Sequence, residues 1–156
     1  MNALRILMNA EQVERINGPE RKWMVDDRLV TAKWAGGFQV DVQAGAFGLR
    51  VDEPERIGGT DTGPQPTDLL LSAVASCFVL SLAYAASKRA IAVERIGVAV
   101  TGTYEGPRFA AIRIEVDIAA PDDVVATLIS AAERVCYVTN TLKRPPEISV
   151  VTRSLD

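Results

Sequence analysis

The chain has 156 residues, of which 48% are hydrophobic and 24% are charged, and its formal net charge is −3. This length suits one ordinary domain, and a weakly acidic chain with scattered basic residues is a poor partner for nucleic acid. The sequence has two cysteines and no histidine, which excludes Ser-His-Asp and Cys-His catalysis and argues against a metal site.

The first twenty residues predict a short amphipathic helix that extends the main domain. We expect residues 1–20 to form this N-terminal extension and residues 21–156 to form a single domain. The segment does not resemble a secretory signal, because Arg5 interrupts its apolar run and Glu11 and Glu14 follow. We therefore expect a cytoplasmic protein, in which both cysteines are reduced at rest.

A strand, a glycine turn and a second strand are predicted over "RLVTAKWAGGFQVDV", with the turn at Gly36-Gly37. Residues 52–66 are rich in Pro, Gly, Asp and Thr, a composition typical of a loop. Because functional residues concentrate on loops, this segment is a candidate for part of a site.

An uncharged helix follows the loop. Pro66 suits a first helical position, and the apolar segment "LLLSAVASCFVLSLAYAA", Leu69 to Ala86, comes next. Three interpretations compete: a membrane span, an inert core helix, or a helix that shields a reactive thiol. The moderate hydrophobicity and the lack of an aromatic belt disfavour a membrane span. One chain of this size can hardly cover every face of so long an apolar helix, so the sequence favours a symmetric dimer in which a second copy covers part of it.

The second half of the chain predicts two strands, a helix and a final strand. A hairpin is expected around Gly106-Pro107, and its second strand alternates apolar and charged residues. A helix should run from Pro121 to about Cys136. The segment "TNTLKRPP" is expected to be a loop or short turn, and "EISVVTR" a strand. This order indicates an α+β domain with mainly antiparallel pairing.

Cys77 and Cys136 fall in two separate predicted helices. Each could be a small buried hydrophobe, or the two could form a redox pair. A reactive Cys77 needs a stabilised thiolate, but it lies about three turns into its helix, beyond the reach of the dipole. Apolar burial also disfavours the charge. Arg56, in the preceding loop, is the candidate cation, and the alternative is that it is a solvated loop residue.

Two segments resemble a known family. "GPQPTDLLLSAVASCF" is similar to the Gly-x-Asn-Pro-Glu-x-Leu…Ala-x-Cys-Phe helix of the osmotically inducible protein C and organic hydroperoxide resistance (OsmC/Ohr) family. "CYVTNTLKRPPEISV" is similar to that family's Cys-Pro-Val-Ser-x-x-Leu…strand segment. The resemblance covers roughly residues 28 to 153 and indicates a divergent OsmC-like branch.

The resemblance implies an intertwined α+β homodimer whose antiparallel sheets wrap around a long central helix. It also implies reduction of organic hydroperoxides without metal or cofactor, with Cys77 as the peroxidatic thiol, Cys136 as the resolving thiol and an external thiol or dithiol as reductant. The family's Glu position holds Thr67 here, with Asp68 beside it. Phe38 follows the Gly-Gly pair, where the organic hydroperoxide branch has its arginine. Tyr137 replaces the Pro after the second Cys.

Our prediction is a cytosolic, dimeric, thiol-dependent hydroperoxide reductase that uses Cys77, Cys136 and Arg56. The alternative is a non-enzymatic protein of the same fold that binds a small apolar ligand at the dimer interface. A third reading is a structural relative whose cysteines only pack. No membrane or nucleic-acid partner is expected.

Overall fold

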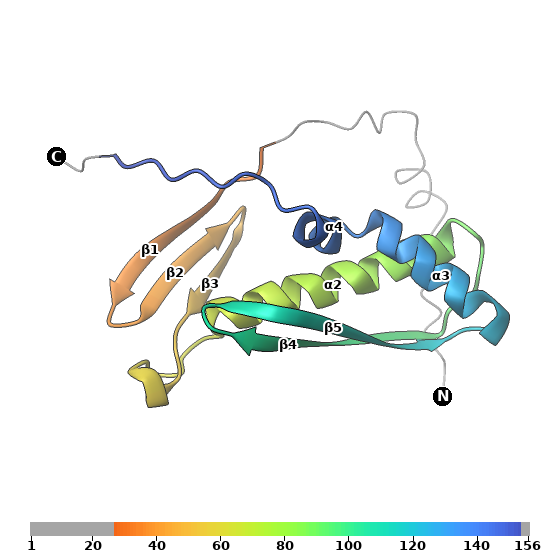
Figure 1. The fold of residues 1–156 in the computed structure, drawn as a ribbon, viewed down its shortest axis with the longest axis horizontal. Helices are drawn as coiled ribbons and strands as arrows, with labels where there is room; N and C mark the ends of the chain where they lie inside the picture. The colour runs from red at the N-terminus through yellow and green to blue at the C-terminus, as the bar shows by residue number, and fades with distance from the viewer. Residues whose placement is uncertain (1–26, 154–156) are drawn as a thin grey trace. The chain divides into compact units, whose positions relative to one another are not determined.

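The computed structural model describes residues 27–153, and the helix expected over residues 1–20 lies outside them. The described elements form an α+β fold with antiparallel sheets and a long apolar helix, as expected from the sequence (Figure 1). Their bounds are β1 (Val30–Gly36), β2 (Gln39–Ala44), β3 (Phe47–Val51), the 3-10 turn η1 (Glu55–Ile57), α2 (Pro66–Ser87), β4 (Arg95–Glu105), β5 (Arg108–Ala119), α3 (Asp122–Val135) and α4 (Tyr137–Lys143).

The described residues divide into two compact units. One contains residues 27–73 and 100–114, and the other contains residues 74–99 and 115–153. Cys77 and Cys136 both belong to the second of these units, and Arg56 belongs to the first.

Strands β1, β2 and β3 form an antiparallel sheet in that order. The predicted turn between the first two strands is confirmed, with Gly36 at φ +114 and Gly37 at φ +53, a region that L side chains rarely adopt. The Trp34 indole donates a hydrogen bond to the Gly37 carbonyl at 2.9 Å, which ties the strand to the turn. The third strand was not predicted, and its pairing with β2 adds the strand that leads into the 52–66 loop.

Helix α2 begins at Pro66, as predicted. Asp68 accepts a hydrogen bond from the Gln65 backbone amide at 3.3 Å, which satisfies a donor near the helix start. At the other end, Ala90 has a φ of +52, and the Ile91 amide donates to the Ala86 carbonyl at 3.1 Å. This bond closes the helix with an alanine at a position where glycine is usual.

The sequence of α2 is apolar all round, but only one stripe of it is buried. The buried side chains recur at helical spacing on one face: Val74, Phe78, Ser81, Leu82, Ala85 and Ala86. Leu80, on another face, is 69% exposed. Among the described helices, α2 is long and apolar enough to cross a membrane, a property shared by core helices of soluble proteins.

Strands β4 and β5 form the predicted hairpin around Gly106, which has a φ of +59. The predicted alternation along β5 is confirmed. Its half-buried positions are Ile112, Ile114, Val116 and Ile118, and its exposed positions include Arg113, Glu115 and Asp117. The β5 pattern therefore marks a strand with one face toward the interior.

The helix predicted from Pro121 to about Cys136 is confirmed as α3, and Cys136 lies at the junction between α3 and α4. Two other predictions for the C-terminal region were wrong. The segment expected as a loop contains α4, because Asn140 and Arg144 donate backbone hydrogen bonds one turn back, to Cys136 and Asn140. The expected final strand lacks regular structure over residues 144–153, since no described strand pairs with it.

We expect Leu128→Ala to destabilise the fold, because Leu128 on α3 has no exposed surface and its loss leaves a cavity. The free energy of unfolding should fall by about 2–5 kcal/mol, measured by urea denaturation. Thr127→Ala is the matched control, since Thr127 is its exposed neighbour on the same helix. Equal effects of the two substitutions would contradict the burial of Leu128.

Candidate functional site

The two cysteines, distant in the sequence, are brought together within one unit. Cys77 lies on α2 and is half-buried, whereas Cys136 has no exposed surface. Both are free thiols, and Cys77 is one of the neighbours that act on the ionisation of Cys136. This places a partly accessible thiol next to a second, fully buried one.

Polar neighbours stabilise the thiolate form of Cys136. Burial opposes ionisation of this thiol, but hydrogen bonds from the Thr139 side chain and backbone favour it. The neighbouring Cys77 and Ser81 side chains favour it as well. Together these donors hold the pKa of Cys136 below its usual value despite the burial.

Ser81 and Thr139 were not singled out by the sequence analysis. Ser81 lies one turn beyond Cys77 on α2, and its hydroxyl donates to the Cys77 carbonyl at 2.8 Å. Thr139 lies one turn beyond Cys136 on α4, and its hydroxyl donates to the Cys136 carbonyl at 3.3 Å. The spacing of a hydroxyl three or four residues after each cysteine was the only available signal, and it is common in helices.

Arg56 lies in η1, in the loop predicted to carry part of the site. Its side chain is exposed and makes no hydrogen bond or ion pair with any residue that the structure describes. Because Arg56 belongs to the other unit, the structure leaves its role with Cys77 as a prediction.

The loop that carries Arg56 is organised around a buried carboxylate. Asp52 has no exposed surface, and one of its oxygens accepts hydrogen bonds from the hydroxyls of Thr60 at 2.6 Å and Thr62 at 2.8 Å. The same oxygen accepts from both backbone amides at 3.1 Å, and the other oxygen accepts from the Glu53 amide at 2.8 Å. The hydrogen bond from the Thr60 hydroxyl lowers the pKa of Asp52 most, and burial raises it. The hydrogen bonds from Thr62 and Glu53 lower it further, so the pKa lies far below its usual value.

Polar side chains connect this loop to the three-stranded sheet. The Gln39 amide donates to the hydroxyls of Thr60 at 2.8 Å and Thr62 at 3.0 Å. Its carbonyl accepts from Arg50 at 3.0 Å, and Arg50 also pairs with Asp41 at 2.7 Å. Only glycine fits at position 59 of the loop, because a Cβ there would overlap the Glu53 backbone. The loop therefore has a defined conformation, fixed at both ends.

Three of the residues that depart from the family pattern make contacts within the fold, and the fourth, Tyr137, is exposed. Thr67 accepts a hydrogen bond from the Tyr104 hydroxyl at 2.7 Å, and Asp68 acts at the start of α2. The Phe38 ring covers Gly58. Tyr137 is 66% exposed at the first position of α4.

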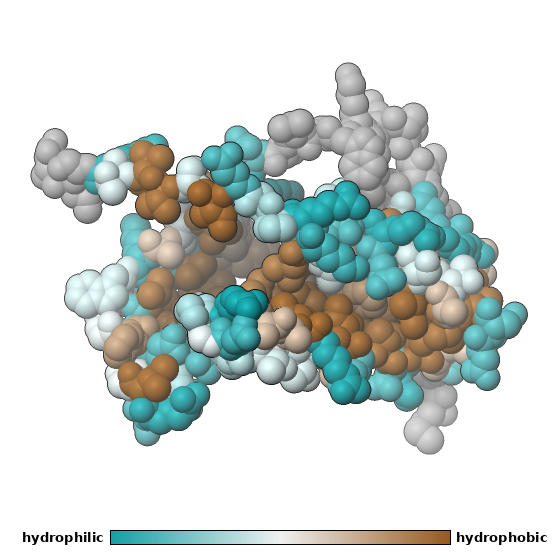
Figure 2. Space-filling model, viewed as in Figure 1, coloured by the Kyte–Doolittle hydropathy of each residue, from teal (hydrophilic) through white to brown (hydrophobic). Residues whose placement is uncertain are grey.

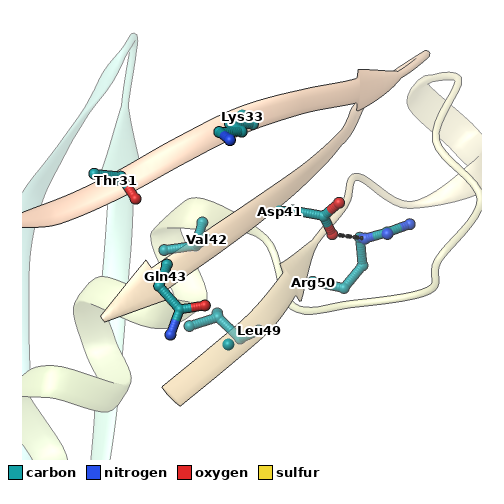
Figure 3. A pocket seen from close by; sticks show the side chains of 8 residues that line it. Thr31, Lys33, Asp41, Val42, Gln43, Leu49 and Arg50 are labelled. Carbon is teal, nitrogen blue, oxygen red and sulfur yellow. Dashed lines mark hydrogen bonds and ion pairs between the residues drawn. The ribbon is translucent and has the colours of Figure 1, made fainter. Parts of the chain in front are cut away.

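A polar hollow lies on the three-stranded sheet (Figure 3). Its volume is about 560 Å³, and its lining consists of Thr31, Lys33, Asp41, Val42, Gln43, Gly48, Leu49 and Arg50. Asp41 on β2 and Arg50 on β3 lie side by side and form the ion pair drawn in Figure 3. The lining contains no thiol, so the hollow does not account for the chemistry expected of this chain. Among the described residues, no group of His, Cys, Asp and Glu could hold a metal ion.

The family profile described as "OsmC-like protein" matches residues 59–151, which include both cysteines. The chain belongs to the OsmC-like protein family. No curated protein matches it by sequence.

Solved structures share the fold of this OsmC-like protein at low sequence identity. An OsmC-like protein from Mycoplasma pneumoniae is 21% identical with a TM-score of 0.65, over 78% of this chain and 91% of that one. An organic hydroperoxide resistance protein from Vibrio cholerae, with captopril bound in one of its active sites, is 22% identical with a TM-score of 0.64, over 81% and 90%. One from Legionella pneumophila is 17% identical with a TM-score of 0.57, over 78% and 92%.

We expect Asp52→Asn to lower the urea midpoint at neutral pH, because an amide cannot accept all the hydrogen bonds that converge on the carboxylate. The folded pKa is depressed, so the stabilisation is present above the pKa of an unfolded aspartate and is lost as pH falls. The difference from wild type should therefore shrink below about pH 4.

Asp41→Asn is the control for this substitution, since Asp41 forms an exposed ion pair with Arg50. Its effect on the midpoint should be the smaller of the two at neutral pH. An Asp52→Asn midpoint that matched wild type at neutral pH would show that the carboxylate does not hold the loop.

Proposed function

We propose that this OsmC-like protein is a thiol-dependent reductase of organic hydroperoxides that works in the cytoplasm. The observation that carries the proposal is the contact between Cys77 and Cys136, in which one thiol is half-buried and the other fully buried. A peroxidatic thiol needs access to its substrate, and a resolving thiol needs only to reach the first one. The burial of the two cysteines supports this division of roles.

The reaction proceeds in three steps. The Cys77 thiolate attacks the distal oxygen of the hydroperoxide, the O–O bond breaks, and the alkoxide takes a proton and leaves as the alcohol. The sulfenic acid on Cys77 then condenses with Cys136, which forms a disulfide and releases water. An external thiol or dithiol reduces this disulfide by exchange and is itself oxidised.

Arg56 is the proposed cation of the site. A guanidinium stays charged when it is partly desolvated, so it can stabilise both the thiolate and the negative charge that develops on the leaving oxygen. Two observations support the assignment. The Arg56 side chain is not committed to another described group, and its loop is fixed by the bonds to Asp52.

The relatives support the choice of substrate. The Vibrio cholerae and Legionella pneumophila proteins of the same fold are named as organic hydroperoxide resistance proteins. The apolar neighbours of Cys77 on α2, among them Val74 and Phe78, favour a hydrophobic peroxide over hydrogen peroxide.

A homodimer is the assembly that we propose. Apolar side chains lie on the surface along α2 and on the extended segment near the C terminus (Figure 2). Only 33% of the most apolar window of α2 is buried, and Ile148, Val150 and Val151 are each more than 80% exposed. Such surface is unusual in a monomer, and a second copy would cover it. The same apolar surface supports the alternative function, binding of a small apolar ligand between two copies.

The central test is reaction of the reduced protein with cumene hydroperoxide. We expect the loss of two thiols per chain and of an equivalent amount of peroxide, both abolished in Cys77→Ser. In Cys136→Ser, the Cys77 sulfenic acid should persist and be trapped by dimedone, since no partner thiol remains. Thiols that survive excess peroxide would exclude the enzyme, and a co-purified apolar ligand beside inert thiols would favour the binding protein.

Removing the guanidinium tests Arg56. We expect Arg56→Ala to slow peroxide reduction by about a hundredfold, because a charge that stabilises the transition state is lost. Alkylation of Cys77 should also require higher pH. Arg108→Ala is the control, since Arg108 is an exposed arginine that pairs with Glu105. An Arg56→Ala protein that alkylates with the wild-type pH dependence would remove Arg56 from the mechanism.

A further inference from the structure

Strand β1 is an open edge of the three-stranded sheet. It pairs with β2 on one side, and no described strand pairs with it on the other. An unpaired edge presents a row of backbone amides and carbonyls to which another strand can bind. Proteins usually shorten, cover or charge such an edge, whereas β1 exposes the large apolar side chains of Val30 and Trp34. The edge is therefore suited to receive one more strand.

The sheet has one apolar face and one polar face. Side chains alternate along a strand, so the register between β1 and β2 assigns each residue to a face. The side chains of the two strands that share the apolar face are Val30, Ala32, Trp34, Val40, Val42 and Ala44. Lys33 and Asp41 lie opposite each other on the polar face. A strand that extends this sheet beyond β1 should therefore be apolar at every second position.

Residues 147–153 have the sequence of such a strand. The segment "EISVVTR" is extended and exposed, and it pairs with no described strand (Figure 1). Polar and apolar residues alternate from Glu147 to Val150. Pro145 and Pro146 have no amide hydrogen to donate to a ladder, so a strand can begin only after them. The protein thus has an unpaired strand sequence as well as an unpaired strand edge.

Charge selects the antiparallel orientation for a pairing of residues 27–33 with residues 147–153. In antiparallel order Lys33 faces Glu147, and Asp27 faces Arg153. In parallel order over the same overlap, Asp27 faces Glu147 and Lys33 faces Arg153, so both pairs repel. A shift of the antiparallel register by two residues in either direction removes both attractive pairs. A shift by one residue turns the apolar side chains to the polar face.

The same antiparallel register matches the apolar faces. Ile148 lies opposite Ala32, and Val150 lies opposite Val30, which is on the apolar face of the sheet. All four of these side chains are exposed in the single chain. The pairing therefore covers apolar surface on both the segment and the sheet.

On the polar face, the register extends a row of charges across the sheet. Arg50 on β3 forms an ion pair with Asp41 on β2 at 2.7 Å, and Asp41 lies opposite Lys33 on β1. Glu147 becomes the next member of this row, so the sign of the charge alternates from strand to strand. The side chains of Lys33 and Glu147 form no hydrogen bond or ion pair with any residue that the structure describes. Both are therefore available for this contact.

We propose that residues 147–153 of one copy pair antiparallel with the β1 edge of a second copy, with Glu147 opposite Lys33 and Arg153 opposite Asp27. The occupant is a second copy, because the single chain leaves both the edge and the segment unpaired. Two such pairings related by a two-fold axis close the dimer and leave neither β1 edge free. The inference rests on the proposed homodimer and names where its two copies join.

Charge reversal tests the pairing. Lys33→Glu places two carboxylates opposite each other, and Glu147→Lys places two ammonium groups opposite each other. Each variant alone should dimerise about tenfold more weakly than wild type in analytical ultracentrifugation, because a dimer contains two such contacts. Glu94→Lys is the control, since it makes the same charge change at an exposed glutamate outside the pairing. It should dimerise as wild type does.

A mixture of the two variants is the decisive measurement. In a heterodimer of Lys33→Glu with Glu147→Lys, both contacts again join opposite charges. After joint unfolding and refolding, with one variant isotopically labelled, native mass spectrometry should find about nine-tenths of the dimers to be heterodimers, against about half for random pairing. Lys33→Glu mixed with Glu94→Lys should give the random value.

A random proportion in the first mixture would overturn the pairing even if the wild type is a dimer. A wild type that stays monomeric at every concentration would overturn the proposed homodimer as well. Since these measurements involve no peroxide, their outcome is independent of whether the protein is a reductase.

Discussion

The contact between Cys77 and Cys136 is the interaction on which the chemistry of this protein depends. It joins a residue in the middle of α2 to the junction of α3 and α4. The contact exists because α2 buries one stripe of its surface. Val74 and Phe78 belong to this stripe, and Cys77 lies beside it. Packing of apolar side chains thus fixes where the two sulfurs meet.

Two buried acids of this protein, Asp52 and Cys136, have pKa values below their usual ones, for the same physical reason. Asp52 and Cys136 both have no exposed surface, and hydroxyl and amide donors surround both. Neutral donors can lower the pKa of a buried acid without a cation, provided that enough of them point at it. At Asp52 the result is a fixed loop, and at Cys136 it is a thiol that ionises more readily than its burial alone would allow. The difference lies in the acid, since a thiolate is a base and nucleophile near neutral pH and a carboxylate is not.

Local patterns in the sequence were sufficient to predict much of the fold. Three predictions are confirmed: the glycine pair at the first turn, Pro66 at the start of α2, and the alternation in β5. The first two depend on the backbone preferences of glycine and proline, and the third depends on the spacing of apolar residues along the strand. The C-terminal predictions failed where the answer depends on distant residues. A strand exists only if another strand pairs with it, and the apolar segment around Val150 has no described partner.

The candidate site shows the same division. The two thiols could be found because they are the only cysteines in the sequence and lie in two recognisable motifs. Ser81 and Thr139 could not, because serine and threonine are frequent on helices and usually bond to the preceding turn. Their position beside a buried sulfur depends on how α2 packs against the α3–α4 junction. Asp52 was likewise hidden, since nothing in a loop sequence tells which acid turns inward.

The end of α2 has a consequence for how the thiol keeps its place. Ala90 adopts a left-handed conformation that costs an L residue about 1–2 kcal/mol, so local backbone preference does not set this terminus. The helix is instead held by its buried stripe, which includes Phe78 and Leu82 on either side of Ser81. The position of Cys77 along the helix axis therefore depends on the packing of this stripe and not on the turn that follows Ser87.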